Sequence, residues 1–471
     1  MFPSLSSTAT VAISIFHVAL ALAVTAHALT HKRDPGSAVA WIGLAWLSPV
    51  VGSVLYVLLG INRVQRRARG LRAAPDADQT ATPVPAMSRT GSLAELEIAA
   101  QRISGRNATD GNAVTVLHNG DDAYPLMLAA IEAATANVAL STYIFRADSI
   151  GLEFIAALAH ARRRGVEVRV LIDGYGGGYV RSQAYRALRS AGVRVDRFLH
   201  SALPWRMPFL NLRTHRKLLA VDGAVAFAGG LNIGDENLIR ARPHYPVHDT
   251  HFRFAGPVVS QFYGAFAEQW SFTTGERLSG PAWAALPVAA GTSTARVVTS
   301  GPDQDLEKIE LIVLAAIGAA RRSIRIMTPY FLPDDRVITA LALAAMRGVD
   351  VDIVVPEHSN HPAVDWAMRA HVDPLLRAGC RIWLHAPPFN HSKLLAVDES
   401  WCFVGSANFD TRSFTLNFEI NVEVYCSDTA LRVNRRILES RRQPLLRAAL
   451  GQRPFPVRMR DSAARLWLPY L

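Results

Sequence analysis

The chain has 471 residues and a formal net charge of +11; half of its residues are hydrophobic and 19% are charged. This composition supports large packed domains and excludes a disordered chain, while three cysteines without CxxC or Cys/His spacing exclude a disulfide framework. The positive charge favours an anionic partner, such as nucleic acid, an anionic membrane surface or a phosphate-bearing substrate.

Two apolar stretches, each about 20 residues long, open the chain. They read TVAISIFHVALALAVTAHAL (10–29) and VAWIGLAWLSPVVGSVLYVLLG (39–60). Each is long enough to cross the hydrocarbon core as an α-helix, and the short connector predicts a two-helix transmembrane hairpin. The alternative for the first stretch is a cleaved signal peptide, but it lacks a basic n-region and a second apolar stretch follows directly.

Basic residues at the ends of these stretches predict their orientation. The connector holds Lys32 and Arg33, whereas the segment 63–72 holds five arginines. Because positive charge concentrates on the cytoplasmic side of membrane proteins, we expect the long C-terminal part to face the cytoplasm. The five arginines are also placed to contact anionic lipid headgroups.

The remainder of the chain alternates strands and helices, and it does so twice. Such alternation predicts an α/β fold with mixed sheets flanked by helices. We therefore divide the chain into a hairpin with a basic juxtamembrane segment (1–72), a Pro-, Ala- and Thr-rich linker (73–112) and two tandem pseudo-symmetric repeats (113–290 and 291–471). In chain order the predicted elements are a helix at 93–104, then strand 112–120, helix 123–136, strand 137–145, helix 150–165 and strand 166–174, and in the second repeat strand 295–301, helix 308–320, strand 322–331, helix 336–348 and strand 349–356.

One phrase occurs late in each repeat. HRKLLAVD spans residues 215–222, and HSKLLAVD begins 176 residues later, at 391–398. Over 215–232 and 391–408 the copies are identical at ten of 18 positions, and the identities include His, Lys, Asp and Asn. A shared strand would preserve only apolar character, so these polar identities indicate one chemical site built from two halves.

In each half the spacing gathers an imidazole, an ammonium and an amide on one face, because residues two apart on an extended chain point the same way. This set suits a phosphoryl group: a nucleophile or acid, a charge clamp and a hydrogen-bond donor. With these cations present, we expect neither a metal nor another cofactor. The residues are His215, Lys217 and Asn232 in the first half, and His391, Lys393 and Asn408 in the second.

Two histidines at one phosphorus predict a double displacement. A neutral imidazole attacks phosphorus, while a protonated one donates to the leaving alcohol and then takes a proton from the incoming alcohol or water. The two imidazoles must therefore differ in protonation, which a carboxylate beside each can set. The candidates are Asp249, 34 residues after His215, and Glu419, 28 residues after His391. The alternative for both is a structural carboxylate at the start of a strand.

The twin H-x-K-x4-D motif, followed each time by G-x-x-N, resembles the phospholipase D superfamily, and within it the chain is similar to bacterial cardiolipin synthases. The first copy has Gly229-Gly230 where the second has Gly405-Ser406, a departure from the general superfamily pattern that is usual in this subfamily. The resemblance runs from about residue 10 to the C-terminus and is weakest at 73–105. Besides the motifs it rests on TYIF, NLRTHRKLLAVDG, GGLNIGDE, DTHFRFAGP, TPYFLPDD, GSANFDTRSF and LNFEINV.

The resemblance implies a transphosphatidylation, in which one phosphatidylglycerol gives its phosphatidyl group to another and forms cardiolipin and glycerol. It implies His215 as nucleophile and His391 as acid, with each motif aspartate bracing its loop. It further implies phosphatidylglycerol and anionic membrane lipid as partners, no nucleic acid, and a multi-pass protein of the bacterial inner (plasma) membrane. The catalytic residues implied by position are His215, Lys217, Asp222, His391, Lys393 and Asp398.

Alternatives remain at this point. A hydrolytic phospholipase D would use the same site with water as acceptor, a nuclease would cleave phosphodiesters in DNA, and a lipid-binding scaffold would be inert. The segment Trp205–Leu210 is either a bilayer-dipping loop at the site's mouth or a buried loop. A basic amphipathic helix is predicted at 435–450, packed on the domain or bound to membrane.

Overall fold

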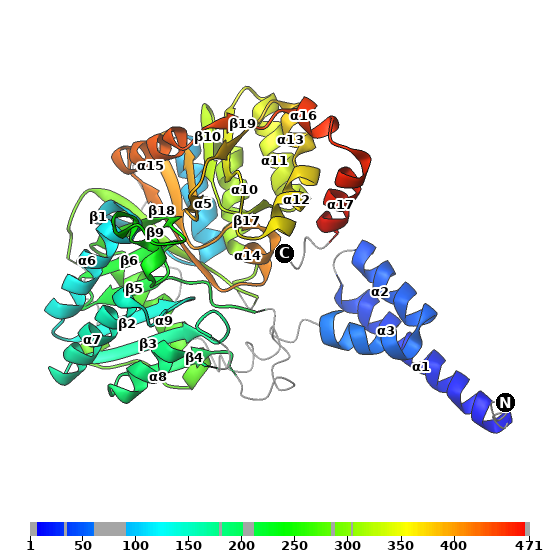
Figure 1. The fold of residues 1–471 in the computed structure, drawn as a ribbon, viewed down its shortest axis with the longest axis horizontal. Coiled ribbons are helices and arrows are strands. Elements are labelled where there is room, and N and C mark those ends of the chain that lie inside the picture. The colour runs from blue at the N-terminus through cyan, green and yellow to red at the C-terminus, as the bar shows by residue number, and fades with distance from the viewer. Residues whose placement is uncertain are drawn as a thin grey trace. The chain divides into compact units, whose positions relative to one another are not determined.

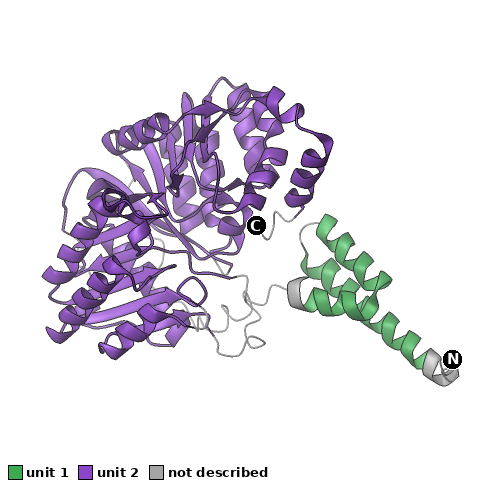
Figure 2. Cartoon of the chain, viewed as in Figure 1, with its two compact units in different colours: residues 1–70 green, residues 71–471 purple. Residues whose placement is uncertain are grey.

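A computed structural model describes residues 7–32, 35–60, 91–178, 181–200, 212–283, 288–302 and 305–466. The chain divides into two compact units, residues 1–70 and 71–471 (Figure 2). The basic segment 63–72 and the Trp205–Leu210 loop lie outside the described residues, so both predictions stand as they were made.

The first unit is helical. Its helices are α1 (Ser7–His31), α2 (Pro35–Leu47), α3 (Pro49–Leu55) and a π-helical turn, η1 (Tyr56–Gly60). Residues Val11–His31 are apolar and long enough to cross a membrane. Helices α2 and α3 fold back on α1, and Val24, Ala28, Ala45 and Tyr56 form a small buried cluster.

The second apolar stretch is not one continuous helix. The helix breaks between α2 and α3 at Ser48-Pro49, and neither piece alone reaches the length of the hydrocarbon core. Pro49 has no N–H to donate, and its ring clashes with the carbonyl one turn back, so a new helix starts at that residue.

The second unit is an α/β domain with two repeats, which confirms the predicted fold class. We call β1 to α9 the first repeat and β9 to α17 the second. The first repeat contains β1 (Thr109–His118), α6 (Asn119–Ala133), β2 (Asn137–Thr142), α7 (Ser149–Arg163), β3 (Glu167–Asp173), α8 (Gln183–Ser190), β4 (Arg194–Phe198), β5 (Leu218–Val221), β6 (Val225–Gly229), η3 (Asp235–Asn237), η4 (Ile239–Ala241), β7 (Val247–His248), β8 (Thr250–Ala255) and α9 (Val259–Thr274), followed by η5 (Pro281–Trp283).

The second repeat follows the same order of main strands and helices, with short elements added within it and three more at its end. It contains β9 (Ser293–Ser300), α10 (Lys308–Ala319), β10 (Ser323–Met327), β11 (Phe331–Leu332), α11 (Asp335–Met346), β12 (Asp350–Pro356), α12 (Pro362–His371), α13 (Asp373–Ala378), β13 (Arg381–His385), β14 (Phe389–Asn390), β15 (Leu394–Val397), β16 (Trp401–Gly405), β17 (Phe409–Asp410), α14 (Thr411–Thr415), β18 (Glu419–Tyr425), α15 (Ser427–Glu439), β19 (Gln443–Pro444), α16 (Arg447–Gly451) and α17 (Phe455–Arg465).

The sheets of the two repeats join into one 15-stranded sheet. Outwards from the centre the first repeat runs β1-β8-β6-β5-β2-β3-β4, and the second runs β9-β18-β16-β15-β10-β12-β13-β19. Because β1 pairs antiparallel with β9, the two orders mirror each other about this junction. The duplicated phrases supply equivalent strands, β5 and β15, and the loops before these strands lie at equivalent positions.

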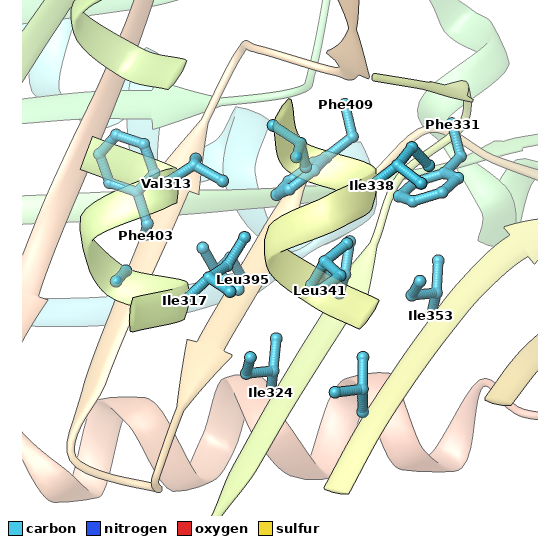
Figure 3. Close-up of a cluster of buried hydrophobic side chains, with 14 of the residues drawn as sticks. Val313, Ile317, Ile324, Phe331, Ile338, Leu341, Ile353, Leu395, Phe403 and Phe409 are labelled. Carbon is cyan, nitrogen blue, oxygen red and sulfur yellow. The ribbon is translucent and has the colours of Figure 1, made fainter. Parts of the chain in front are cut away.

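Three clusters of buried side chains in the second unit hold together the layers of helices and strands that Figure 1 shows. Helices α6, α7 and α8 cover one face of the first repeat, whereas α10 and α11 cover the corresponding face of the second. Figure 3 shows that second cluster, where Ile317 and Leu341 from the helices meet Ile324 and Ile353 from the strands. Helices α9 and α15 share the third cluster with strands from both repeats, so the repeats form one core.

Two segments differ from the predicted arrangement. Helix α5 (Ser92–Ser104), within the predicted linker, packs through Leu96 and Ala100 against the second repeat's core. The helix predicted at 435–450 is wrong as one element, because α15 ends at Glu439 and β19 and α16 follow. Pro444 cannot donate in the middle of a helix, and β19 pairs with β13 at the sheet edge instead.

Candidate active site

Each histidine of the duplicated phrase is attached to the other repeat. The N–H of His215 donates to the carbonyl of Phe418 (2.9 Å), and the N–H of His391 donates to the carbonyl of His248 (2.7 Å). A bridge between Thr214 and Phe418 and the parallel pairing of β14 with β7 extend these contacts. The two phrases therefore converge on one place between the repeats.

The orienting carboxylates are exchanged relative to the prediction. His215 Nδ1 lies 3.0 Å from both carboxylate oxygens of Glu419, and His391 Nδ1 lies 2.9 Å from Asp249 Oδ2. Glu419 follows Phe418, whose carbonyl accepts the N–H of His215, and Asp249 follows His248, whose carbonyl accepts the N–H of His391. The expectation that each carboxylate serves the histidine of its own repeat is wrong, because inter-repeat strand pairing, not sequence distance, sets the partner.

The two imidazoles face each other. Their ring centroids are 6.2 Å apart and their planes meet at 85°. Both line a cavity of about 1310 Å3, which is large enough for the polar parts of two lipids. With Nδ1 of each ring engaged by a carboxylate, Nε2 is the atom left for a substrate.

The motif lysines lie behind the histidines. Both are 2% exposed. Lys217 Nζ donates to the carbonyl of His215 (2.8 Å), Lys393 Nζ donates to that of His391, and neither is among the described residues lining the cavity. Burial lowers the pKa of Lys217 well below its usual range and that of Lys393 to about 8. A phosphodiester anion between the histidines would favour the charged ammonium forms.

The motif asparagines do line the cavity. Asn232 Oδ1 accepts from the N–H of Ile144 (3.2 Å), which leaves the nitrogen of its amide for another partner. Asn408 is 5% exposed, and its amide oxygen has no hydrogen-bond partner among the described residues. Since buried polar atoms are nearly always paired, this unsatisfied acceptor marks a position for a hydroxyl or another donor of a ligand.

The motif aspartates lie at the far ends of β5 and β15, away from the histidines. The Asp222 carboxylate accepts three backbone N–H bonds and the hydroxyl of Thr135, whereas Asp398 accepts N–H bonds from residues 321–323. Asp222 (φ 52°) and Gly223 (φ 66°) form a left-handed turn at the end of β5. These contacts brace the loops, and neither aspartate is among the described residues that line the cavity.

Asp222→Asn should therefore cost stability and spare chemistry. An amide replaces one accepting oxygen with a donor that faces N–H groups, so we expect the protein to lose about 2–3 kcal/mol. The apparent Tm in detergent measures this loss, and the specific activity of the folded protein should stay within about tenfold. Asp398→Asn is the matched variant. A loss of activity above 100-fold at unchanged Tm would place the aspartate in the reaction.

In the ligand-free site the pKa values of both imidazoles are lowered. Burial and then Lys217 lower the pKa of His215 well below its usual range, and burial and then Lys393 lower the pKa of His391 to about 3. Both imidazoles are thus neutral before substrate arrives. Burial also raises the pKa of the Glu419 carboxyl, to about 7. A phosphodiester next to His391 supplies the negative charge that an imidazolium needs.

The Gly-Gly and Gly-Ser pairs noted in the sequence occupy equivalent places beside the two carboxylates. The hydroxyl of Ser406 donates to Glu419. A Cβ at Gly230 would lie 2.1 Å from Asp249 Oδ1, so this position has no room for any side chain. In the first half the carboxylate of Asp249 therefore fills the space that the side chain of Ser406 fills in the second half.

Gly230→Ala should displace Asp249 from His391. The carboxylate is 1% exposed, so its displacement disturbs buried contacts, and we expect activity to fall about 10–100-fold, the usual cost of losing an orienting partner. Lipid turnover and Tm are measured together, with Gly264→Ala as control, because a Cβ at Gly264 meets no atom within 4 Å. Full activity in Gly230→Ala would show that the contact is dispensable.

Several cavity residues were not given a role by sequence reasoning. Tyr143 packs edge-on against His215 (5.3 Å between ring centroids), and Phe389 lies against His391 (5.9 Å). Arg213 and Arg412 also line the cavity. A signal existed for Arg213, which precedes His215 by two positions and so shares its face of the extended segment.

Comparison with known proteins gives consistent matches. The family described as "Cardiolipin synthase, PLD-like domain" matches residues 127–262 and 313–440, and "Phospholipase_D-nuclease N-terminal" matches 19–60. A cardiolipin synthase of Geobacillus kaustophilus (strain HTA426) is 34% identical over 97% of this chain and 92% of its own length. Major cardiolipin synthase ClsA of Bacillus subtilis (strain 168) is 30% identical over 99% of this chain and 100% of its own.

A solved structure supports the fold. The phosphatidylserine synthase of Haemophilus influenzae Rd KW20 superposes with a TM-score of 0.61, covering 80% of this chain and 100% of its own, at 13% sequence identity. At that identity the likeness concerns the fold alone.

Proposed function

The chain belongs to the cardiolipin synthase family of phospholipase D-like proteins, and from that premise we propose that it is a phosphatidyltransferase that makes cardiolipin and glycerol from two phosphatidylglycerol molecules. The observation that carries the proposal is the pair of facing imidazoles, each held at Nδ1 by a buried carboxylate in one large cavity. Two such groups can serve one phosphorus from opposite sides.

In the first step, Nε2 of His215 attacks the phosphorus of one phosphatidylglycerol. The N–P bond forms, the bond from phosphorus to the glycerol oxygen breaks, and protonated His391 gives its proton to that oxygen. Glycerol leaves, and the phosphatidyl group remains on His215. The motif lysines and the amides of Asn232 and Asn408 are the groups that offset charge on the phosphoryl oxygens.

In the second step, a primary hydroxyl of another phosphatidylglycerol enters beside His391. Its proton goes to the neutral imidazole while its oxygen bonds to phosphorus and the N–P bond breaks. Cardiolipin leaves, with His215 neutral and His391 protonated again. Glu419 and Asp249 act as positioning residues, because each accepts the Nδ1–H that fixes Nε2 toward phosphorus.

Membrane attachment fits phospholipid substrates. We propose attachment through α1 and the α2–α3 pair to a bacterial inner (plasma) membrane, with more than one pass and the catalytic unit facing the cytoplasm. The apolar span Val11–His31 supports the anchor, and the charge difference between the connector and the segment 63–72 supports the orientation. Such an anchor favours a lipid over nucleic acid as the phosphodiester substrate.

The test is a product analysis of the purified full chain with phosphatidylglycerol in mixed micelles. Cardiolipin and glycerol in equal amounts are expected. Phosphatidate without cardiolipin would establish the hydrolytic alternative, and DNA cleavage without lipid turnover would establish a nuclease. Inertness toward both would leave a binding scaffold. A variant lacking both motif histidines, prepared identically, controls for contaminating enzymes.

A further inference from the structure

The last described helix of the chain, α17, exposes an apolar face. Phe455, Met459 and Leu466, at its start, in its middle and just after its end, are 71%, 56% and 79% exposed. Because residues four and seven apart lie one above the other on an α-helix, all three side chains share one side of α17. A single exposed apolar residue is ordinary, but three large ones aligned on one helix indicate an interaction surface.

The other side of α17 holds the helix on the catalytic unit, where it packs against α12 (Figure 1). Asp461 is fully buried and forms ion pairs with Arg453 and Arg460. The Arg460 guanidinium also lies 4.2 Å from the ring centroid of Trp366 on α12. Ala464 packs against the buried cluster of the second repeat. These contacts leave the apolar face of α17 pointing away from the unit.

Basic residues border the apolar face. Arg458 and Arg465 are exposed, and their spacing of seven residues places both along one edge of that face. The only acidic residue of α17 is Asp461, whose carboxylate is already engaged by Arg453 and Arg460. An apolar face with arginines at its edge is typical of helices that lie in the interface of an anionic membrane, where the guanidinium groups reach the phosphates.

We propose that α17 lies in the headgroup region of an anionic membrane, with Phe455, Met459 and Leu466 inserted toward the acyl chains. The charge of the arginines favours this occupant, since a second copy of the chain would bring like charges together on the same face. The first residues of α12, Pro362 to Val364, line the active-site cavity. Contact through α17 therefore holds the unit that carries the cavity at the lipid surface, in addition to the N-terminal anchor. The inference deepens the proposed function by naming the surface that meets the lipid.

The test measures contact with lipid and not turnover. The full chain with Met459→Cys carries a bimane label in a Cys426→Ser background, because Cys380 and Cys402 are buried and Cys426 is half-buried. It is reconstituted into vesicles of phosphatidylcholine and phosphatidylglycerol that contain nitroxide-labelled lipid. We expect quenching of at least about twofold at position 459. The matched control is Met346→Cys on α11, which is 68% exposed and should show little quenching.

Two further variants of the labelled chain test the parts of the surface. Phe455→Ser should remove about half of the quenching, because it withdraws one of three apolar side chains from the membrane. The double variant Arg458→Gln, Arg465→Gln should weaken quenching in vesicles with phosphatidylglycerol and not in vesicles of phosphatidylcholine alone, because only anionic lipid attracts the guanidinium groups.

The opposing results are equally specific. Equal quenching at positions 459 and 346, or none at either, would overturn the proposal. A blue-shifted bimane emission without quenching would also overturn it, because protein would then cover the face, from a second copy or from another part of this chain. Failure of the same preparation to make cardiolipin would contradict the proposed function and leave the membrane contact to be decided by quenching alone.

Discussion

His215→Ala should lower lipid turnover by about 10⁴-fold or more and leave no phosphatidyl-enzyme, because the only atom that forms the N–P bond is gone. His391→Asn should behave differently. Without an acid the first step slows by about 10²–10⁴-fold, but the nucleophile is intact and the intermediate that forms has no base to release it. His215→Ala thus stops the first step, whereas His391→Asn slows the first step and blocks the second, although the two imidazoles lie only 6.2 Å apart.

The measurement is a trapping experiment with phosphatidylglycerol labelled in its acyl chains. Protein is denatured at neutral pH, because acid hydrolyses the N–P bond, and label on the chain is counted against time. Label that accumulates slowly and persists is expected in His391→Asn, and none in His215→Ala. The reverse pattern would exchange the two roles, and near-normal turnover in His215→Ala would remove a covalent intermediate on that residue.

The duplicated phrase made the fold and the centre of the site predictable. Alternating strands and helices set the layers, and the repeat of His-x-Lys with a later Asn required two equivalent loops. These are local patterns, in which residues two apart share a face and apolar residues mark buried strands. The apolar strands β5 and β15 follow directly from these patterns.

The partners of the histidines could not be predicted in the same way. Asp249 and Glu419 were recognised as candidates, but their assignment depends on which strand lies beside which loop. That pairing joins residues about 140–200 positions apart, as in the bond between His391 and Asp249. No local pattern encodes it, and the nearer carboxylate in sequence is the wrong one.

The break at Ser48-Pro49 has a different origin. Hydropathy measures whether a segment is apolar, and residues 39–60 satisfy it throughout. Helix continuity depends on backbone hydrogen bonds, which proline interrupts in any solvent. The sequence contains this signal at Pro49 and, for the C-terminal helix, at Pro444. Both predictions followed the composition of the segment and not its proline.

Glu419→Gln should lower turnover about 10³-fold and change its pH dependence, whereas Asp249→Asn should keep that dependence. As a carboxylate, Glu419 accepts Nδ1–H of His215 and leaves the lone pair of Nε2 for phosphorus. When protonated it donates to Nδ1, and the imidazole proton moves to Nε2, where attack is impossible. Since burial raises the pKa of Glu419 to about 7, wild-type activity should rise as pH increases through 7, and this rise should vanish in Glu419→Gln.

The raised pKa of Glu419 also predicts how stability depends on pH, and this trend is opposite to that of activity. A buried carboxyl whose pKa goes from its usual 4.5 to about 7 on folding favours the folded state at low pH, and about 3 kcal/mol of that contribution is lost as pH rises from 4.5 to 7. Glutamine does not titrate, so the Tm of Glu419→Gln relative to wild type should increase across this window. A variant that is less active yet relatively more stable at pH 8 than at pH 5 is the expected signature. If the wild-type rate shows no rise near pH 7, or the relative Tm is flat, Glu419 is ionised throughout and only its geometry matters.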